Sequence, residues 1–119
     1  MKKIEFDKKF DKLKGNSWST VRRYNEENIK KYSNIGDIFE VFVEKKSNGL
    51  AVLKNKLIVS GSELNFYSLV NDTILNGKID WDWYFKIKNM KKCFLLTFEM
   101  LVPVEVKGEI EWIMEIQLF

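Results

Sequence analysis

Apolar and polar residues alternate along several stretches of the chain, which is the pattern of β-strands that bury one face. The alternation is clearest near the C-terminus, where Trp112 and Met114 share one face and Glu111 lies on the other. Asn48-Gly49 lies between two such stretches, and this dipeptide is a strong signal for a β-hairpin turn. The expected strands cover residues 2–6, 19–23, 37–44, 50–59, 93–101 and 104–119.

Apolar residues recur at helical spacing between these strands, and Asn25 and Asp80 stand where two helices would need an N-cap. The expected helices cover residues 7–14, 25–32, 63–75 and 81–87. The order of elements predicts a mixed α+β domain. Its centre is a small, mostly antiparallel β-barrel of five or six strands, with two or three short helices.

The composition is that of one globular domain over residues 1–119, with 45% hydrophobic and 31% charged residues. Cys93 is the one cysteine, so an internal disulfide is excluded and a reducing compartment is indicated. The chain has no His, which excludes a Ser-His-Asp triad and a His-based zinc site. Neither a membrane-length apolar run nor a signal peptide is present in this sequence, so we expect a cytoplasmic protein without a membrane partner. No cofactor is expected.

Charge is distributed unevenly along the chain, although the net charge is only +3. Residues 1–31 carry a balance of +5 and residues 93–119 a balance of −4. The basic third is either a solvated helix face or one side of a polyanion site. In the second case one continuous positive surface should lead to Thr20; its members would be Lys8, Lys9, Lys12, Lys14, Arg22 and Arg23.

One segment, residues 15–41, combines a glycine, the sequence Thr20-Val21-Arg22 and the turn Gly36-Asp37 before an apolar run. This order resembles the ASCH family of small β-barrels in the PUA-like group of RNA-associated domains. The resemblance covers roughly residues 3–101 and implies a PUA-like barrel. Thr20 and Arg22 alternate along an extended segment, so a hydroxyl and a cation point the same way.

The resemblance also implies a Lys/Thr/Glu constellation in catalytic members, which remove the acetyl group from acetylcytidine, while some relatives cleave RNA. Thr20 matches the family threonine. Ser17 stands at the lysine position and Asn76 near the glutamate position, and neither can act as a base at neutral pH. Asp72, four residues before Asn76, and Lys14 are the candidate substitutes, so the catalytic candidates are Thr20, Asp72 and Lys14.

Aromatic and basic residues lie close together around the Thr20 strand, a combination typical of sites for single-stranded nucleic acid. The alternatives are that Trp18 belongs to the core, that Arg22 pairs with Asp37 or Asp72, and that Arg23 is merely solvated. The nucleic-acid-binding candidates are Ser17, Trp18, Arg22, Arg23, Tyr24 and Asn76.

Three functions remain open from the sequence. The preferred hypothesis is an RNA- or nucleotide-binding PUA-like domain without the full catalytic set of the family, whose partner is RNA or a modified nucleoside. An amidohydrolase acting on acylated nucleosides, or a ribonuclease, is the enzymatic alternative. A protein-interaction scaffold that pairs through its C-terminal strand is the third.

Overall fold

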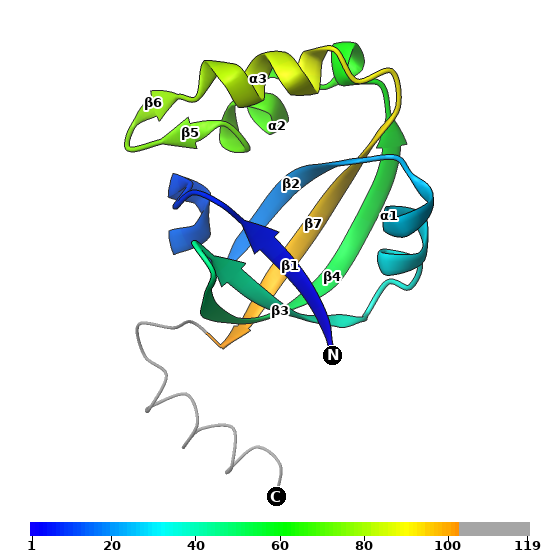
Figure 1. Cartoon of the computed structure of the whole chain (residues 1–119), viewed down its shortest axis with the longest axis vertical. Coiled ribbons are helices and arrows are strands. Elements are labelled where there is room, and N and C mark those ends of the chain that lie inside the picture. The colour runs from blue at the N-terminus through cyan, green and yellow to red at the C-terminus, as the bar shows by residue number, and fades with distance from the viewer. Residues whose placement is uncertain (103–119) are drawn as a thin grey trace, which may run out of the picture.

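The computed structural model describes residues 1–102, and the strand expected over residues 104–119 lies outside this part. Five strands form one curled, mixed sheet that makes a half-barrel (Figure 1). In sheet order these are β1 (Lys2–Phe6), β3 (Ile38–Val43), β4 (Lys46–Val59), β7 (Cys93–Val102) and β2 (Ser17–Arg23). β1 runs parallel to β3, and the other neighbouring pairs are antiparallel. The expected α+β class, with a barrel-like sheet and short helices, is confirmed.

The helices within the described residues are α1 (Glu26–Lys31), α2 (Phe66–Asn71) and α3 (Trp81–Lys88). Two of the expected N-caps are confirmed. The Asn25 side chain accepts a hydrogen bond from the backbone N–H of Asn28 at 2.8 Å, and the Asp80 side chain accepts one from Trp83 at 3.5 Å. None of the helices in residues 1–102 is long and apolar enough to cross a membrane.

Two expected helices are shorter than the sequence pattern indicates. Of residues 7–14 only η1 (Asp11–Lys14) is helical, as a 3-10 turn, because Phe10 before it has an extended backbone with φ −57° and ψ 141°. The helix expected over residues 63–75 is reduced to α2, because the side chain of Asn65 caps it and starts it late. Local backbone conformation at Phe10 and side-chain capping by Asn65 therefore override the apolar periodicity in these segments.

A second, two-stranded sheet lies beside α2 and α3 and was not expected (Figure 1). It is a hairpin of β5 (Ile74–Leu75) and β6 (Lys78–Ile79). Its turn residues Asn76 and Gly77 have φ of 53° and 75°, the positive values that a type I′ turn requires. The carboxylate of Asp11 accepts hydrogen bonds from both of their N–H groups at 2.8 Å and so ties the hairpin to η1.

The prediction of a hairpin turn at Asn48-Gly49 was wrong. β3 and β4 are joined instead by Glu44-Lys45, which have φ of 52° and 67°. Asn48 and Gly49 lie inside β4, where its register with β3 shifts and Gly49 has φ of 98°. Asn-Gly suits a β-bulge as well as a turn, because both need a residue that tolerates positive φ.

Two apolar clusters hold the fold together. The larger fills the half-barrel, where Trp18 stacks on Phe98 with ring centroids 5.0 Å apart and Phe98 meets Phe39 edge to face. The smaller lies between the sheet and α2 and α3. Its buried members are Val21, Leu64, Leu69, Ile87, Met90 and Cys93. Cys93 is fully buried in this cluster.

Candidate functional site

Strands β1 and β2 are the two edges of the sheet, so the half-barrel is open between them. A cleft of about 350 Å³ lies at this opening, and we call it the seam cleft. Its lining residues are Glu5, Phe6, Asp7, Lys8, Phe10, Thr20, Arg22, Arg23, Asp72, Asp80, Asp82, Trp83 and Lys86. The structure therefore brings together four residues predicted from the sequence, namely Thr20, Arg22, Arg23 and Asp72.

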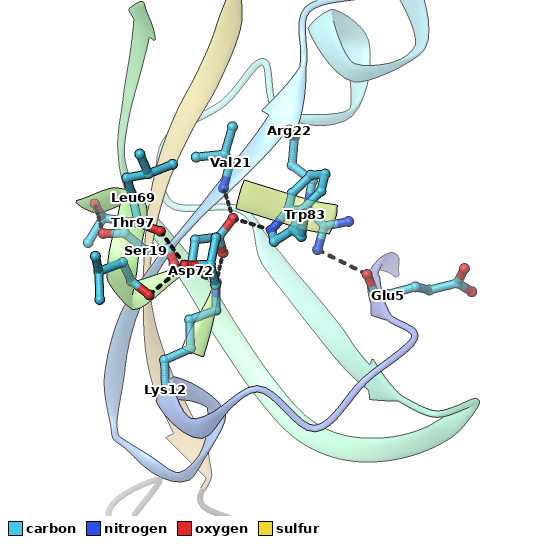
Figure 2. A network of polar contacts seen from close by, with 11 residues as sticks. Glu5, Lys12, Ser19, Val21, Arg22, Leu69, Asp72, Trp83 and Thr97 are labelled. Atoms are coloured by element: carbon cyan, nitrogen blue, oxygen red, sulfur yellow. Dashed lines mark hydrogen bonds and ion pairs between the residues drawn. The ribbon is translucent and has the colours of Figure 1, made fainter. Parts of the chain in front are cut away.

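Asp72 is the centre of a buried polar network beside the seam cleft (Figure 2). Its carboxylate forms an ion pair with Lys12 and accepts hydrogen bonds from the Val21 backbone N–H at 3.1 Å and the Trp83 indole N–H at 2.9 Å. The Lys12 ammonium also donates to the Ser19 carbonyl at 2.6 Å. Because Ser19 and Val21 belong to β2, the ion pair satisfies edge groups that would otherwise be free to bind another strand.

Burial changes the acid–base chemistry of Lys12. Desolvation lowers the pKa of Lys12 from 10.5 to about 8, although the Asp72 carboxylate acts in the opposite direction. A lysine with this pKa is partly neutral in mildly basic solution and can then accept a proton. Lys14, for which the sequence suggested this role, is exposed, whereas Lys12 is buried against Asp72, a residue of the cleft lining.

Thr20 lies in the middle of β2 and is 1% exposed, with its side chain on the wall of the seam cleft. No hydrogen bond to its hydroxyl is found among residues 1–102. Its place in the cleft lining keeps Thr20 a candidate for contact with a ligand or, beside a base, for a nucleophile.

Arg22 joins the two edges of the sheet across the seam cleft. Its guanidinium donates to the Glu5 carbonyl at 2.9 Å and lies 4.6 Å from the centroid of the Phe6 ring (Figure 2). Its buried Nε has no partner within the described part of the chain. The alternative that Arg22 pairs with Asp37 or Asp72 is wrong, because both aspartates pair with lysines instead.

A second hollow adjoins the seam cleft, and its lining residues come from the ends of β2 and α3 and the segment before β7. We call it the basic groove; its volume is about 600 Å³. Its lining residues are Arg23, Tyr24, Asn25, Lys86, Asn89, Met90, Lys91 and Lys92. Four of these are cations and none is a carboxylate. Arg23 and Lys86 also line the seam cleft, so the two hollows share a wall.

Tyr24 contributes a partly exposed aromatic ring to the basic groove. One side of the ring packs against Phe94, with centroids 5.1 Å apart. The Lys92 ammonium lies 4.0 Å from the Tyr24 centroid, within the range of a cation–π contact. The cation thus lies over a face of the ring, and both the ring and the cation belong to the lining of the groove.

The other predicted binding residues lie elsewhere. Trp18 is 5% exposed, and its ring packs against Phe98 and Phe6. It therefore belongs to the core, which is one of the two interpretations drawn from the sequence, and it has no ring face open to a base. Ser17 is exposed at the start of β2, the opposite end from Arg23. Asn76 is exposed in the turn between β5 and β6.

The continuous positive surface considered for the N-terminal third is broken by ion pairs. Lys8 binds Asp80 at 2.7 Å and Lys12 is buried against Asp72. The Asp80 contact raises the pKa of Lys8, and the same contact lowers the pKa of Asp80. Within residues 1–102, the basic groove has four cations and no carboxylate in its lining, and Arg23 is the cation of the groove that belongs to residues 1–31.

Sequence reasoning named Lys12 as a surface cation only, so it missed the buried pair with Asp72, and it missed the lysines of the basic groove. Lys86, Lys91 and Lys92 are close in sequence to each other, and this cluster is the signal that could have found the groove. Nothing in the local sequence marks Lys12, whose partner is 60 residues away. Among the described residues, no group of three Cys, Asp or Glu side chains could hold a metal ion.

Comparisons with known proteins do not assign this chain to a family. No family model, curated protein or solved structure matches it. The similarity to ASCH proteins therefore stays a hypothesis drawn from the sequence.

Proposed function

We propose that this protein binds RNA or a nucleotide, with phosphate groups in the basic groove and one nucleoside in the seam cleft. The observation that carries the proposal is the make-up of the groove, which has four cations and one tyrosine ring but no carboxylate among its lining residues. Lysine and arginine supply most of the affinity for phosphates, and aromatic rings hold unpaired bases.

The seam cleft suits the uncharged part of such a ligand better than a phosphate. Its wall carries the carboxylates of Glu5, Asp7, Asp72, Asp80 and Asp82. These groups repel phosphate but accept hydrogen bonds from the amino groups of a base or the hydroxyls of a ribose. A volume of about 350 Å³ is within the usual range of small-molecule sites, and the shared wall of Arg23 and Lys86 connects it to the groove.

The proposal is tested by titrating a fluorescein-labelled single-stranded RNA at several salt concentrations. We expect Lys91→Gln/Lys92→Gln to weaken binding about tenfold or more and to lower the salt slope by about 1.4, because each lost phosphate contact removes about 0.7 from the slope. The matched control is Lys46→Gln/Lys54→Gln, which removes the same charge from exposed positions of β4. Equal weakening by both pairs, or no binding by the wild type, contradicts the proposal.

A second candidate function is hydrolysis of an acylated nucleoside in the seam cleft, and Lys12 is the observation that favours it. Thr20 would attack the acyl carbonyl while neutral Lys12 takes its proton. Lys12 would return this proton to the amino nitrogen of the base as the C–N bond breaks and the nucleoside leaves, and water would then hydrolyse the threonine ester to the free acid and Thr20. The lowered pKa of Lys12 and its bond to Ser19, next to Thr20, support this role.

Turnover of acetylcytidine by the purified chain tests this candidate. We expect activity to rise with an apparent pKa near that of Lys12, about 8, and to be lost in Thr20→Val, which removes the hydroxyl but keeps the shape. Lys14→Met is the control, because Lys14 is exposed and outside the cleft lining. Absence of turnover, or turnover unchanged in Thr20→Val, eliminates the candidate and leaves RNA binding untouched.

A further inference from the structure

Helix α3 exposes two large aromatic rings that have no role in the core. Trp81 is 54% exposed and Phe85, one turn later, is 56% exposed. Their ring centroids are 5.8 Å apart with an interplanar angle of 28°, so the rings form a short stack. Tyr84 supports both rings edge to face. Two exposed rings held in place by a third make a rigid apolar surface, which is uncommon without a partner.

This aromatic surface continues into the basic groove. Trp81, Phe85 and Asn89 are spaced by four residues, so they follow one another along the same side of α3, and Asn89 lines the groove. The distance along the helix axis from the first to the last is about 12 Å. Lys88 in the last turn and Lys92 just beyond it add positive charge at this end.

We infer that Trp81 and Phe85 form a stacking platform for unpaired bases of the strand whose phosphates lie in the basic groove. The inference rests on the proposed function, which is binding of RNA or a nucleotide, and it specifies that the ligand is single-stranded RNA. Bases in a duplex stack on one another, so their faces are closed, whereas those of a single strand are free to stack on protein rings. The rings lie along α3, and most of the cations of the basic groove lie at or just beyond the C-terminal end of this helix, an order that suits the bases and phosphates of one extended strand.

The test compares three ligands of equal length: single-stranded RNA, an abasic ribose-phosphate oligomer and duplex RNA. We expect Trp81→Ala/Phe85→Ala to weaken binding of the single strand by roughly 30-fold or more, the loss of about two stacked bases. Binding of the abasic oligomer should be unchanged. Lys91→Gln/Lys92→Gln should weaken both ligands, because the phosphates are common to them.

The matched control is Phe66→Ala/Tyr67→Ala on α2, which removes two rings that are 66% and 81% exposed but lie off the α3 series. This control should leave all three affinities unchanged, and the wild type should prefer the single strand to the duplex. Equal effects of the two aromatic pairs, or equal loss of abasic binding in Trp81→Ala/Phe85→Ala, overturn the inference. So does a dimer that dissociates in that variant while RNA affinity stays constant, since the face would then bind a second copy.

The two proposals fail in different ways. If the wild type binds the single strand and the abasic oligomer equally well, phosphate binding stands and the stacking platform is overturned. If the wild type binds none of the three ligands, the proposed function is overturned, and the inference falls with it.

Discussion

Lys12 and Asp72 are 60 residues apart in sequence and form a buried ion pair. This pair also satisfies two backbone groups on the free edge of β2. Both charges are almost fully enclosed, with side-chain exposures of 6% and 2%. Through Ser19 and Val21 the pair binds the backbone of the edge strand itself. One contact thus joins η1, the end of α2 and the sheet, and it lies beside the seam cleft.

We predict that removing either partner of this pair destabilises the protein strongly. Lys12→Met leaves the Asp72 carboxylate buried without its cation, for which the expected cost is about 3–5 kcal/mol. Asp72→Ala should cost at least as much, because it also deprives the Val21 and Trp83 N–H groups of their acceptor. Urea unfolding measures both.

The control for this prediction is Lys54→Met, which breaks the exposed pair between Lys54 and Glu99. Exposed pairs contribute less than about 1 kcal/mol, so this variant should unfold almost as the wild type does. Equal losses for Lys12→Met and Lys54→Met would mean that burial of the first pair has no energetic consequence.

The lowered pKa of Lys12 predicts how stability depends on pH. In the folded protein Lys12 loses its proton near pH 8, whereas in the unfolded chain it keeps the proton up to about its ordinary value of 10.5. Between these values the unfolded state binds more protons, so rising pH favours the folded state. The contribution of Lys12 to the free energy of unfolding should therefore rise from pH 8 to pH 10.5 and stay level below pH 8.

This contribution is obtained by subtracting the unfolding free energy of Lys12→Met from that of the wild type at each pH. The subtraction removes the titration of Lys8, Lys31 and Tyr32, which both proteins share. A difference that falls across the same interval would show that burial does not lower the pKa of Lys12.

The third prediction concerns the stability of a variant at Gly61. This residue begins the 3-10 turn η2 (Gly61–Glu63) and lies directly against the end of α3. A Cβ at this position would lie 1.7 Å from the carbonyl oxygen of Ile87, which belongs to the helix backbone and cannot rotate away. Gly61→Ala should therefore destabilise the protein by about 3 kcal/mol. Glu63→Ala, an exposed change in the same turn, should stay within about 0.5 kcal/mol in the same thermal or urea unfolding experiment.

Much of the fold follows from local sequence patterns, whereas the site does not. The strands from residues 2–6, 19–23 and 93–101, and the caps Asn25 and Asp80, were predicted because alternation and capping act over a few residues. The turn between β3 and β4 was misplaced because Asn48-Gly49 carries a local signal that turns and bulges share, and only the pairing of the two strands places the turn at Glu44-Lys45.

The candidate site depends on contacts between distant residues. Thr20, Arg22 and Asp72 were singled out through the family resemblance and the alternation of β2, and all three lie in the wall of the seam cleft. Lys12 could not be predicted in this way, since only the folded chain brings it to Asp72. Trp18 shows the converse, because an aromatic residue beside arginines has the same sequence signature in a core as on a binding surface.

The measurement that tests the central claim most directly is a map of backbone amide chemical shifts during titration with a short single-stranded RNA. Phosphate binding in the basic groove predicts the largest changes at Arg23, Tyr24, Asn89, Lys91 and Lys92, with smaller ones along the seam cleft at Thr20. Saturating changes confined to the turn between β3 and β4 around Lys45, or no changes at all, would contradict the account.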